Sequence, residues 1–194
     1  MKQIRESSGK RFSLLAVMGE QVFHAGDLAN LWNIRNPSTL HMTLSRYVSQ
    51  GLLFRIHKGL YSIKKPIDLH PHLIGLKALH EPAYISCETV LFDAGIINQP
   101  PQSITIVSGV ARRFALAGND YYSRKLANDF LFNSAGVRIQ DGIRIANVPR
   151  AVADTLYFNS KKHFDAPSVI PWDSVRDIMN TMGYPLMRRY DHTR

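Results

Sequence analysis

The chain has 194 residues, of which 45% are hydrophobic and 20% charged, and its formal net charge is +9. This composition favours one or two globular domains over a disordered chain. The longest unbroken apolar run is five residues, Leu14 to Met18, so we expect neither a transmembrane helix nor a secretory signal. Cys87 is the single cysteine, which excludes an internal disulfide and favours a cytoplasmic protein.

The positive charge is unevenly distributed. Residues 1–65 hold 10 Lys or Arg against 3 Asp or Glu, a net of +7, whereas residues 66–194 hold 14 against 12, a net of +2. A basic N-terminal third favours a polyanionic partner such as nucleic acid. The alternative is that these lysines and arginines only keep the protein soluble.

The first third of the chain predicts two short helices before a third one. Residues 9–18 form the first helix, with Phe12, Leu15 and Ala16 facing inward. A short strand is expected at Val22-Phe23, and a second helix covers residues 25–32. Residues 33–36 form the turn that leads into the third helix. Two helices joined by a short turn are typical of a helix-turn-helix unit.

The third helix has one apolar face and one polar face. Asn36 can cap it, Pro37 suits its first turn, and Gly51 ends it. The apolar stripe consists of Leu40, Leu44, Tyr47 and Val48. The opposite face is small and polar with one long cation, and suits the reading of base edges in the major groove. Its residues are Ser38, Thr39, Met42, Ser45, Arg46 and Ser49.

A basic hairpin follows this helix. A two-residue turn at Lys58-Gly59 would pair Ile56 with Tyr61 and Phe54 with Ile63. This register leaves Arg55, His57 and Lys58 at or near the tip, which is the layout of a winged helix-turn-helix. Phosphate neutralisation would then come from the basic residues Lys10, Arg11, Arg35, Arg55, Lys58, Lys64 and Lys65.

The sequence Lys64-Lys65-Pro66 predicts a boundary between domain 1–65 and domain 66–194. Residues 69–80 form a short helix or linker that Pro71 breaks. Beyond it we expect mixed α and β structure. Strands are predicted at residues 83–86, 104–107, 113–117, 121–126, 137–139 and 143–146, and helices at 86–94, 149–158 and 172–182. Hairpin loops fall at residues 118–120 and 140–142, the second pairing Ile139 with Ile143 and Val137 with Ile145.

Several short motifs occur in an order that resembles a known family. They are Lys58-Gly59-Leu60-Tyr61, Ala83-Tyr84-Ile85-Ser86, Ala94-Gly95-Ile96-Ile97, Ile104-Thr105-Ile106 and Ile145 to Ala151 with Asp154. Together they resemble the AbiEi-type antitoxins of type IV, abortive-infection toxin–antitoxin systems, over roughly residues 10–160. The resemblance implies a bacterial α+β protein with two domains. Its winged helix-turn-helix would repress its own operon, and its C-terminal mixed α/β domain with antiparallel hairpins would oppose a nucleotidyltransferase-like toxin without needing a stable complex.

No catalytic or metal-binding constellation is visible. His70, His72 and His80 lack the cysteine or clustered carboxylates of a recognised ligand pattern, and Cys87 has no evident histidine partner. We therefore expect no enzyme activity, no metal and no cofactor. Arg150 and Asp154 are spaced i, i+4, as an ion pair or as part of an antitoxin surface. The other candidates for that surface are Arg112, Arg113, Arg124 and Lys125, for which a solvated face is the alternative.

These patterns favour an α+β, cytoplasmic DNA-binding repressor and antitoxin. Its expected partners are its own promoter, as double-stranded DNA with inverted repeats, and the cognate toxin, with no membrane. The expected DNA-binding residues are Arg35, Ser38, Thr39, Met42, Ser45, Arg46, Arg55, His57 and Lys58. A nucleic-acid-processing enzyme with a winged-helix specificity domain, or a one-component ligand-sensing regulator, would also account for the pattern.

Overall fold

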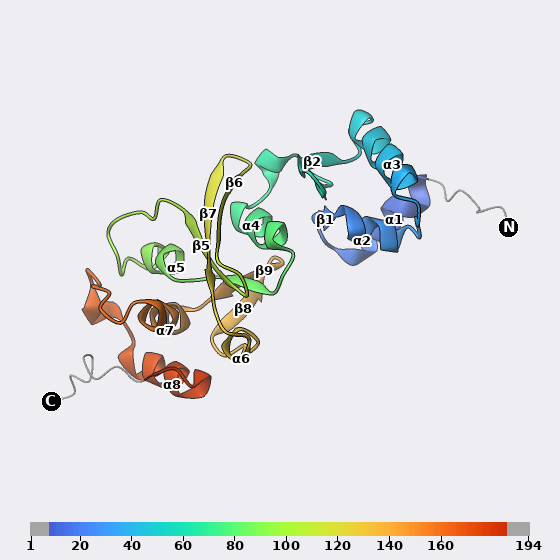
Figure 1. The fold of residues 1–194 in the computed structure, drawn as a ribbon. Coiled ribbons are helices and arrows are strands. Elements are labelled where there is room, and N and C mark those ends of the chain that lie inside the picture. The colour runs from blue at the N-terminus through green and yellow to red at the C-terminus, as the bar shows by residue number, and fades with distance from the viewer. Residues whose placement is uncertain (1–7, 186–194) are drawn as a thin grey trace. The chain divides into compact units, whose positions relative to one another are not determined.

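The computed structural model describes residues 8–185 and shows an α+β protein, as predicted (Figure 1). The chain forms two compact units, Met1–Ala78 and Leu79–Arg194. Among the described residues, no helix combines the length and apolar character needed to span a bilayer.

The described part of unit 1 contains a three-stranded antiparallel sheet and four α-helices, the last of which ends one residue past the division between the units. In chain order the elements are α1 (Ser8–Met18), β1 (Val22–His24), α2 (Ala25–Leu31), α3 (Pro37–Ser49), β2 (Phe54–His57) and β3 (Leu60–Ser62). The strand order β1-β3-β2 places β1 beside the second strand of the hairpin. A 3-10 turn, Pro66–Asp68, and α4 (Pro71–Leu79) follow.

An apolar cluster holds α1, α2 and α3 against the sheet of unit 1. Its buried members are Leu15, Phe23, Leu28, Trp32, Leu40, Leu44, Tyr47, Leu53 and Tyr61. Tyr47 lies at its centre, in edge-on contact with the rings of Phe12 and Trp32 at centroid distances of 5.2 and 5.7 Å. Phe12 and Leu15 therefore contact the core as predicted, but Ala16 is exposed, because Leu15 takes the inward position on this short helix.

The hairpin keeps the predicted turn but changes register. His57 pairs with Leu60 across Lys58-Gly59, and a bulge between Arg55 and His57 then shifts the pairing by one residue. Phe54 therefore faces Ser62 and Arg55 faces Tyr61, so the predicted Ile56–Tyr61 and Phe54–Ile63 pairs are wrong. A bulge inserts one residue into one strand, which turn chemistry alone does not reveal.

The helix α4 extends unit 1 beyond the predicted boundary. Pro71 begins this helix rather than breaking it, as a proline can in a first turn. Lys77 near its end contacts residues around β1: its ammonium group lies 2.8 Å from Glu20, and its carbonyl oxygen hydrogen-bonds Nε2 of His24. The division between the units consequently falls between Ala78 and Leu79, later than the expected 65/66 boundary.

Unit 2 is built around a six-stranded mixed sheet. Its strands are β4 (Ala83–Ile85), β5 (Ile104–Ser108), β6 (Arg112–Leu116), β7 (Asn119–Lys125), β8 (Val137–Gln140) and β9 (Ile143–Ala146), in the order β6-β7-β5-β4-β9-β8. The β4–β9 and β5–β7 pairs are parallel, and the others are antiparallel. Its helices are α5 (Glu88–Asp93), α6 (Asn128–Leu131), α7 (Val148–Phe158) and α8 (Trp172–Met182), with a 3-10 turn at Pro167–Val169.

Both hairpins of unit 2 close with tighter turns than predicted. Ile139 pairs with Arg144 and Gln140 with Ile143, so the turn is the two residues Asp141-Gly142, both with positive φ. The other hairpin turns at Ala117-Gly118, again with two positive φ values, so its strand β7 already begins at Asn119. Two left-handed residues match the twist of the strands, which favours this two-residue turn over the predicted three-residue loops.

Candidate nucleic-acid interface

The third helix presents the expected polar face to solvent. The Asn36 side chain accepts hydrogen bonds from the backbone N–H groups of Ser38 and Thr39, at 2.9 and 3.2 Å, and so fixes the start of α3. Leu40, Leu44 and Tyr47 are buried on the opposite side, together with Thr43, which the apolar stripe did not include. The predicted reading residues Ser38, Thr39, Met42, Ser45 and Arg46 are all exposed, and Met42 is 70% accessible.

The hairpin is anchored directly to α3. The backbone N–H groups of Leu52 and Leu53 donate to the carbonyl oxygen of Tyr47, at 2.9 and 3.2 Å, and the Leu53 side chain is completely buried. The chain therefore leaves α3 along a defined path into β2. Arg46 lies with its guanidinium carbon 5.4 Å from the centroid of the Tyr47 ring. The helix α3 and the hairpin are thus joined through Tyr47.

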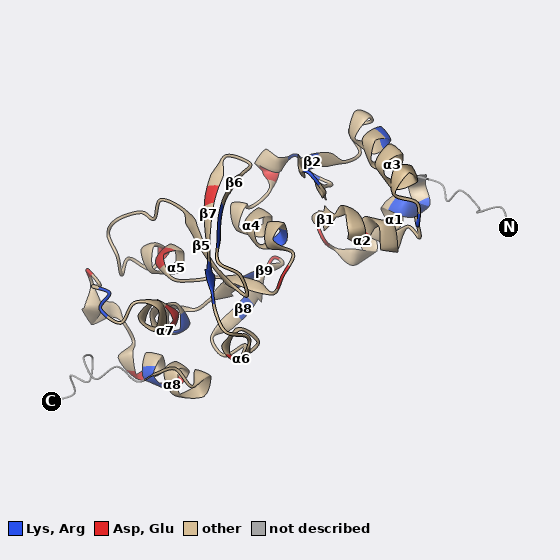
Figure 2. Cartoon of the chain, viewed as in Figure 1, with Lys and Arg blue, Asp and Glu red and all other residues tan. Residues whose placement is uncertain are grey.

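The hairpin tip and the turn before α3 carry the remaining predicted contacts. Arg55 and His57 alternate outward along β2, and Lys58 follows them in the turn. Arg35 is exposed in the turn between α2 and α3. Figure 2 shows basic positions on α3 and on the hairpin. The structure therefore places all nine predicted DNA-binding residues on exposed parts of unit 1.

Arg11 departs from the predicted phosphate contacts. Its Nη1 donates to the hydroxyl oxygen of Tyr47 at 3.5 Å, and its guanidinium carbon lies 5.7 Å from the Trp32 ring centroid. Its carbonyl oxygen also accepts from the indole N–H of Trp32 at 3.3 Å. Arg11 is half-buried and braces α1 against α2 and α3, so we assign it a structural role.

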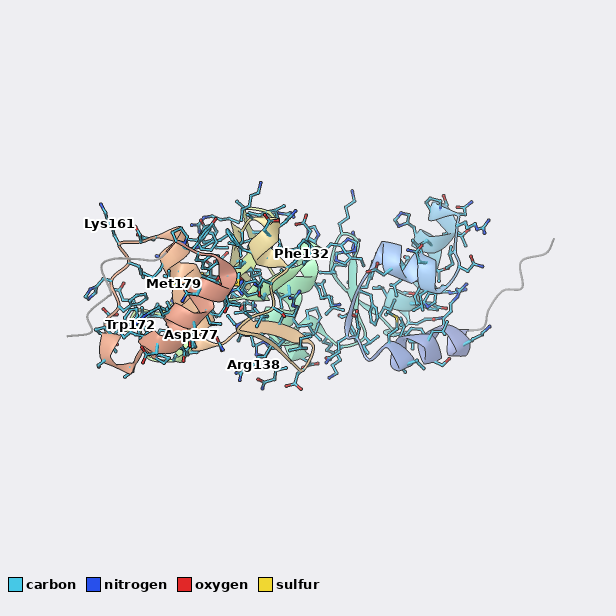
Figure 3. All side chains as sticks on the ribbon, turned by 90° about the horizontal axis from the view of Figure 1, so that it is seen from below. Phe132, Arg138, Lys161, Trp172, Asp177 and Met179 are labelled. Atoms are coloured by element: carbon cyan, nitrogen blue, oxygen red, sulfur yellow. The ribbon has the colours of Figure 1, made fainter. Side chains whose placement is uncertain are left out.

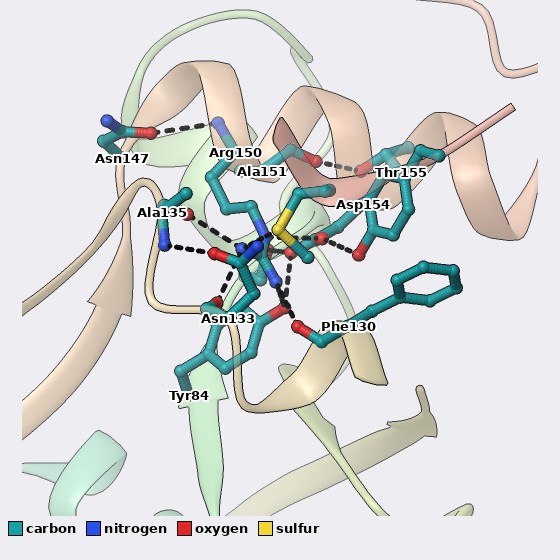
Figure 4. A network of polar contacts seen from close by, with 12 residues as sticks. Tyr84, Phe130, Asn133, Ala135, Asn147, Arg150, Ala151, Asp154 and Thr155 are labelled. Atoms are coloured by element: carbon teal, nitrogen blue, oxygen red, sulfur yellow. Dashed lines mark hydrogen bonds and ion pairs between the residues drawn. The ribbon is translucent and has the colours of Figure 1, made fainter. Parts of the chain in front are cut away.

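Arg150 and Asp154 were candidates for a partner surface, but neither is accessible: both side chains are fully buried in unit 2. Asn147 caps α7 by accepting from the backbone N–H of Arg150 at 2.9 Å. Within this helix, Nε of Arg150 donates to Oδ1 of Asp154 at 2.8 Å. The pair is therefore part of the core of unit 2, and the partner-surface alternative does not hold for these two residues (Figure 4).

The Asp154 carboxylate accepts four hydrogen bonds. Besides Arg150, Oδ1 accepts from the hydroxyl of Tyr184 at 2.8 Å, and Oδ2 accepts from Tyr84 at 3.0 Å and from Ser86 at 2.7 Å. The guanidinium group of Arg150 donates to the carbonyl oxygen of Phe130 in α6, to those of Asn133 and Ala135 in the segment that leads into β8, and to the Tyr84 hydroxyl oxygen. This network joins β4, α6, the segment before β8, α7 and Tyr184, two residues after the end of α8 (Figure 4).

Burial changes the acidity of the groups around this network. It raises the pKa of the Tyr84 and Tyr184 hydroxyls, and the neighbouring Asp154 carboxylate adds to the effect. Burial also raises the pKa of the Cys87 thiol, which lies at the N-cap of α5. A raised pKa keeps the thiol protonated, which disfavours a nucleophilic role. Within residues 8–185, no three His, Cys, Asp or Glu side chains gather in a way that could hold a metal ion.

The other four surface candidates lie on the β6–β7 hairpin. Arg112, Arg113 and Lys125 are exposed. Arg124 is largely buried, and its Nη2 forms an ion pair with Oε1 of Glu88 at 2.8 Å. The strands predicted at residues 113–117 and 121–126 form this hairpin. The sequence did not predict that the rings of Tyr122 and Phe158 lie against Arg124, because Phe158 comes from α7, more than 30 residues further along the chain.

Comparison with known proteins adds little to this description. No protein family model matches the chain, and no curated protein matches it. The crystal structure of the RV2827C protein from Mycobacterium tuberculosis is similar at 13% sequence identity, with a TM-score of 0.46, over 93% of this chain and 69% of that one. A likeness at this level carries no functional argument.

Proposed function

We propose that the chain is a cytoplasmic repressor that binds the double-stranded DNA of its own promoter through a winged helix-turn-helix, and that it also acts as an antitoxin. The single observation that carries the DNA-binding part is the exposed polar face of α3 joined directly to a basic hairpin. The antitoxin part rests on the sequence resemblance alone. It assigns unit 2 to opposing a nucleotidyltransferase-like toxin, without catalysis by this chain.

The chemistry of the α3 face suits the major groove. That groove admits an α-helix, and an arginine can donate two hydrogen bonds to O6 and N7 of guanine. Arg46 supplies this group, while the Met42 side chain suits contact with a thymine methyl group. The hydroxyls of Ser38, Thr39 and Ser45 can bond base edges or phosphates. Arg55, His57 and Lys58 then lie along the neighbouring backbone or minor groove, and Arg35 contacts phosphate.

DNA binding is tested by titrating the full chain against its promoter and against random duplex at several salt concentrations. We expect tighter binding to the promoter, and a log–log salt slope of about −4 if some four to five phosphates are neutralised. The Arg46→Ala variant should lose roughly 1–3 kcal/mol of discrimination between the two DNAs, whereas Lys58→Ala should weaken both alike. Arg176→Ala on α8 removes a charge from unit 2 and is the matched control. Equal affinity of the wild type for promoter and random duplex would refute the repressor.

The antitoxin part is tested by co-expression with a nucleotidyltransferase-like protein encoded beside this gene. The full chain should restore growth, and Arg46→Ala should still restore it, because that residue lies in unit 1. Growth that stays arrested with a folded, expressed chain would refute the antitoxin assignment and leave the repressor standing.

A further inference from the structure

A row of alternating cationic and aromatic groups covers one face of the β6–β7 hairpin. Arg113 and Tyr122 are cross-strand partners, and the guanidinium carbon of Arg113 lies 3.9 Å from the Tyr122 ring centroid. Arg124 is two residues further along β7, on the same face, 5.4 Å from the Tyr122 centroid and 5.3 Å from that of Phe158. The order Arg113, Tyr122, Arg124, Phe158 is therefore a continuous stack, which we call the arginine–aromatic row.

The row is held in place at Arg124 and is open to solvent at Arg113. Arg124 is fixed by Glu88, whose Oε2 in turn accepts from the hydroxyl of Thr105 at 3.4 Å. Tyr122 and Phe158 are half-buried, whereas Arg113 is exposed on β6, an edge strand of the sheet. A planar guanidinium group on a fixed ring offers a flat, positively charged surface on which a further planar group can stack.

A hollow of about 490 Å³ lies beside the row. Glu88 borders both features, because it lines the hollow and pairs with Arg124. Apolar lining comes from Ile97, Pro100 and Pro101, and polar lining includes Asn98, Gln99, Lys162 and His163. Asp165 fixes the wall, since its carboxylate accepts from the backbone N–H of Asn98 at 2.7 Å and its own N–H donates to the carbonyl oxygen of Ile96 at 3.0 Å.

We propose that this face of unit 2 binds single-stranded nucleic acid, with bases stacked along the arginine–aromatic row and one nucleotide in the hollow. Proteins that bind single strands combine cations that follow the backbone with rings on which bases stack. The row supplies both kinds of group in alternation. The hollow has the apolar walls and amide groups that a base requires, and its size falls in the range of small-ligand sites. This surface is distinct from the duplex-binding face proposed for unit 1.

The charges along this face agree with a polyanion. Both acidic groups of the lining are engaged: Glu88 by Arg124 and Thr105, and Asp165 by the backbone of Asn98. Arg113 and Lys162 add positive charge at the two ends. An acidic protein would pair with the charge of Arg113, but it would use neither the flat face of that guanidinium group nor the hollow. Stacking therefore favours single-stranded nucleic acid over an acidic protein surface.

The test measures fluorescence anisotropy of a labelled, unstructured single-stranded RNA and DNA of about ten nucleotides with the full chain. We expect Arg113→Gln and Tyr122→Leu each to weaken binding at least about fivefold, the low end of what stacking contributes per base. Arg113→Lys should also weaken it, because lysine keeps the charge but lacks the planar group. The matched control is Arg138→Gln on β8, the opposite edge of the sheet, where the labelled Arg138 lies in Figure 3. It should change affinity less than twofold.

The single-strand titrations also distinguish this proposal from the duplex binding proposed for unit 1. The same titrations in an Arg46→Ala, Lys58→Ala background should give unchanged single-strand affinity, whether or not the promoter is bound. An equal effect of Arg113→Gln and Arg138→Gln would reduce the binding to unspecific charge and overturn the proposal. So would efficient competition by poly-glutamate, which would identify an acidic protein surface. Arg113 is exposed, so its two variants remain informative even where Tyr122→Leu fails to fold.

Discussion

Replacing Asp154 by asparagine tests how much the buried network stabilises unit 2. The change is nearly isosteric but removes the only carboxylate that faces the Arg150 guanidinium within hydrogen-bond distance in the described structure. It also brings an amide NH₂ group toward hydroxyl donors, because Tyr84, Ser86 and Tyr184 all donate to this carboxylate. The substitution therefore leaves a buried cation without its counter-charge and turns one of the two accepting positions into a donor that faces other donors.

The expected cost follows from the complete burial of both side chains. Removing one partner of a buried ion pair typically destabilises by about 3–5 kcal/mol, because the remaining charge stays desolvated. Tyr184→Phe removes a single hydrogen bond to a charged acceptor and should cost less, roughly 1.5–3 kcal/mol. Replacing Arg124 by glutamine should cost roughly 1 kcal/mol or less, since the Arg124 and Glu88 side chains keep 18% and 19% of their surface exposed and their pair is therefore partly solvated.

The assay is urea unfolding followed by tryptophan fluorescence. The chain has two tryptophans, Trp32 in unit 1 and Trp172 on α8, so a Trp32→Phe background makes Trp172 the reporter of unit 2. We expect the decrease in the urea midpoint to be smallest in Arg124→Gln, larger in Tyr184→Phe and largest in Asp154→Asn. A loss below about 1 kcal/mol for Asp154→Asn would show that water or rearrangement compensates for the missing carboxylate, and the reasoning would fail.

Two further predictions concern unit 2. Burial raises the pKa of Tyr121 to about 12 and also raises the pKa values of Tyr84 and Tyr184, so the folded state keeps protons that the unfolded state loses above its tyrosine pKa of 10.0. The free energy of unfolding should therefore be full below pH 10 and fall between pH 10 and 12. Urea midpoints measured against pH should show this fall, and it should be less steep in Tyr184→Phe. Gly136 has φ +71, and a Cβ added there would lie 2.7 Å from Cβ of Arg150, so Gly136→Ala should destabilise unit 2 by well over 1 kcal/mol. Gly118→Ala is the control, because Gly118 has a similar φ but open space around an added Cβ, and it should destabilise less. Equal shifts of the melting temperature in the two variants would contradict the steric argument.

Local signals predicted the elements well because each has a local physical cause. The Asn36 cap, Pro37 and the stripe through Tyr47 determine α3 within its own thirteen residues. The strand at Val22-Phe23 and the helix at residues 172–182 also appear where the pattern placed them. Such features depend on caps and periodicity, which the sequence displays directly.

The errors lie where a distant partner decides the outcome. The bulge between Arg55 and His57 belongs to the pairing of β2 with β3, which the Lys58-Gly59 turn does not specify. Lys77 belongs with unit 1 because of Glu20 and His24, more than fifty residues earlier. Likewise, the i, i+4 spacing of Arg150 and Asp154 predicted the ion pair but not its burial, which depends on Tyr84 from β4 and Tyr184 after α8.

The two proposed surfaces differ in the chemistry of their side chains. The α3 face offers hydroxyls, a thioether and a guanidinium group, which can contact base edges while the bases stay stacked in a duplex. The arginine–aromatic row offers the flat faces of rings and guanidinium groups, which only unstacked bases can reach. Arg150 is buried in the core of unit 2 and takes no part in the row. Within the row, Arg124 pairs with Glu88, so Arg113 is the cation that is exposed for a partner. The affinity of unit 2 for single strands should therefore fall less steeply with salt concentration than the affinity of unit 1 for duplex DNA, because stacking rather than phosphate neutralisation would supply most of it.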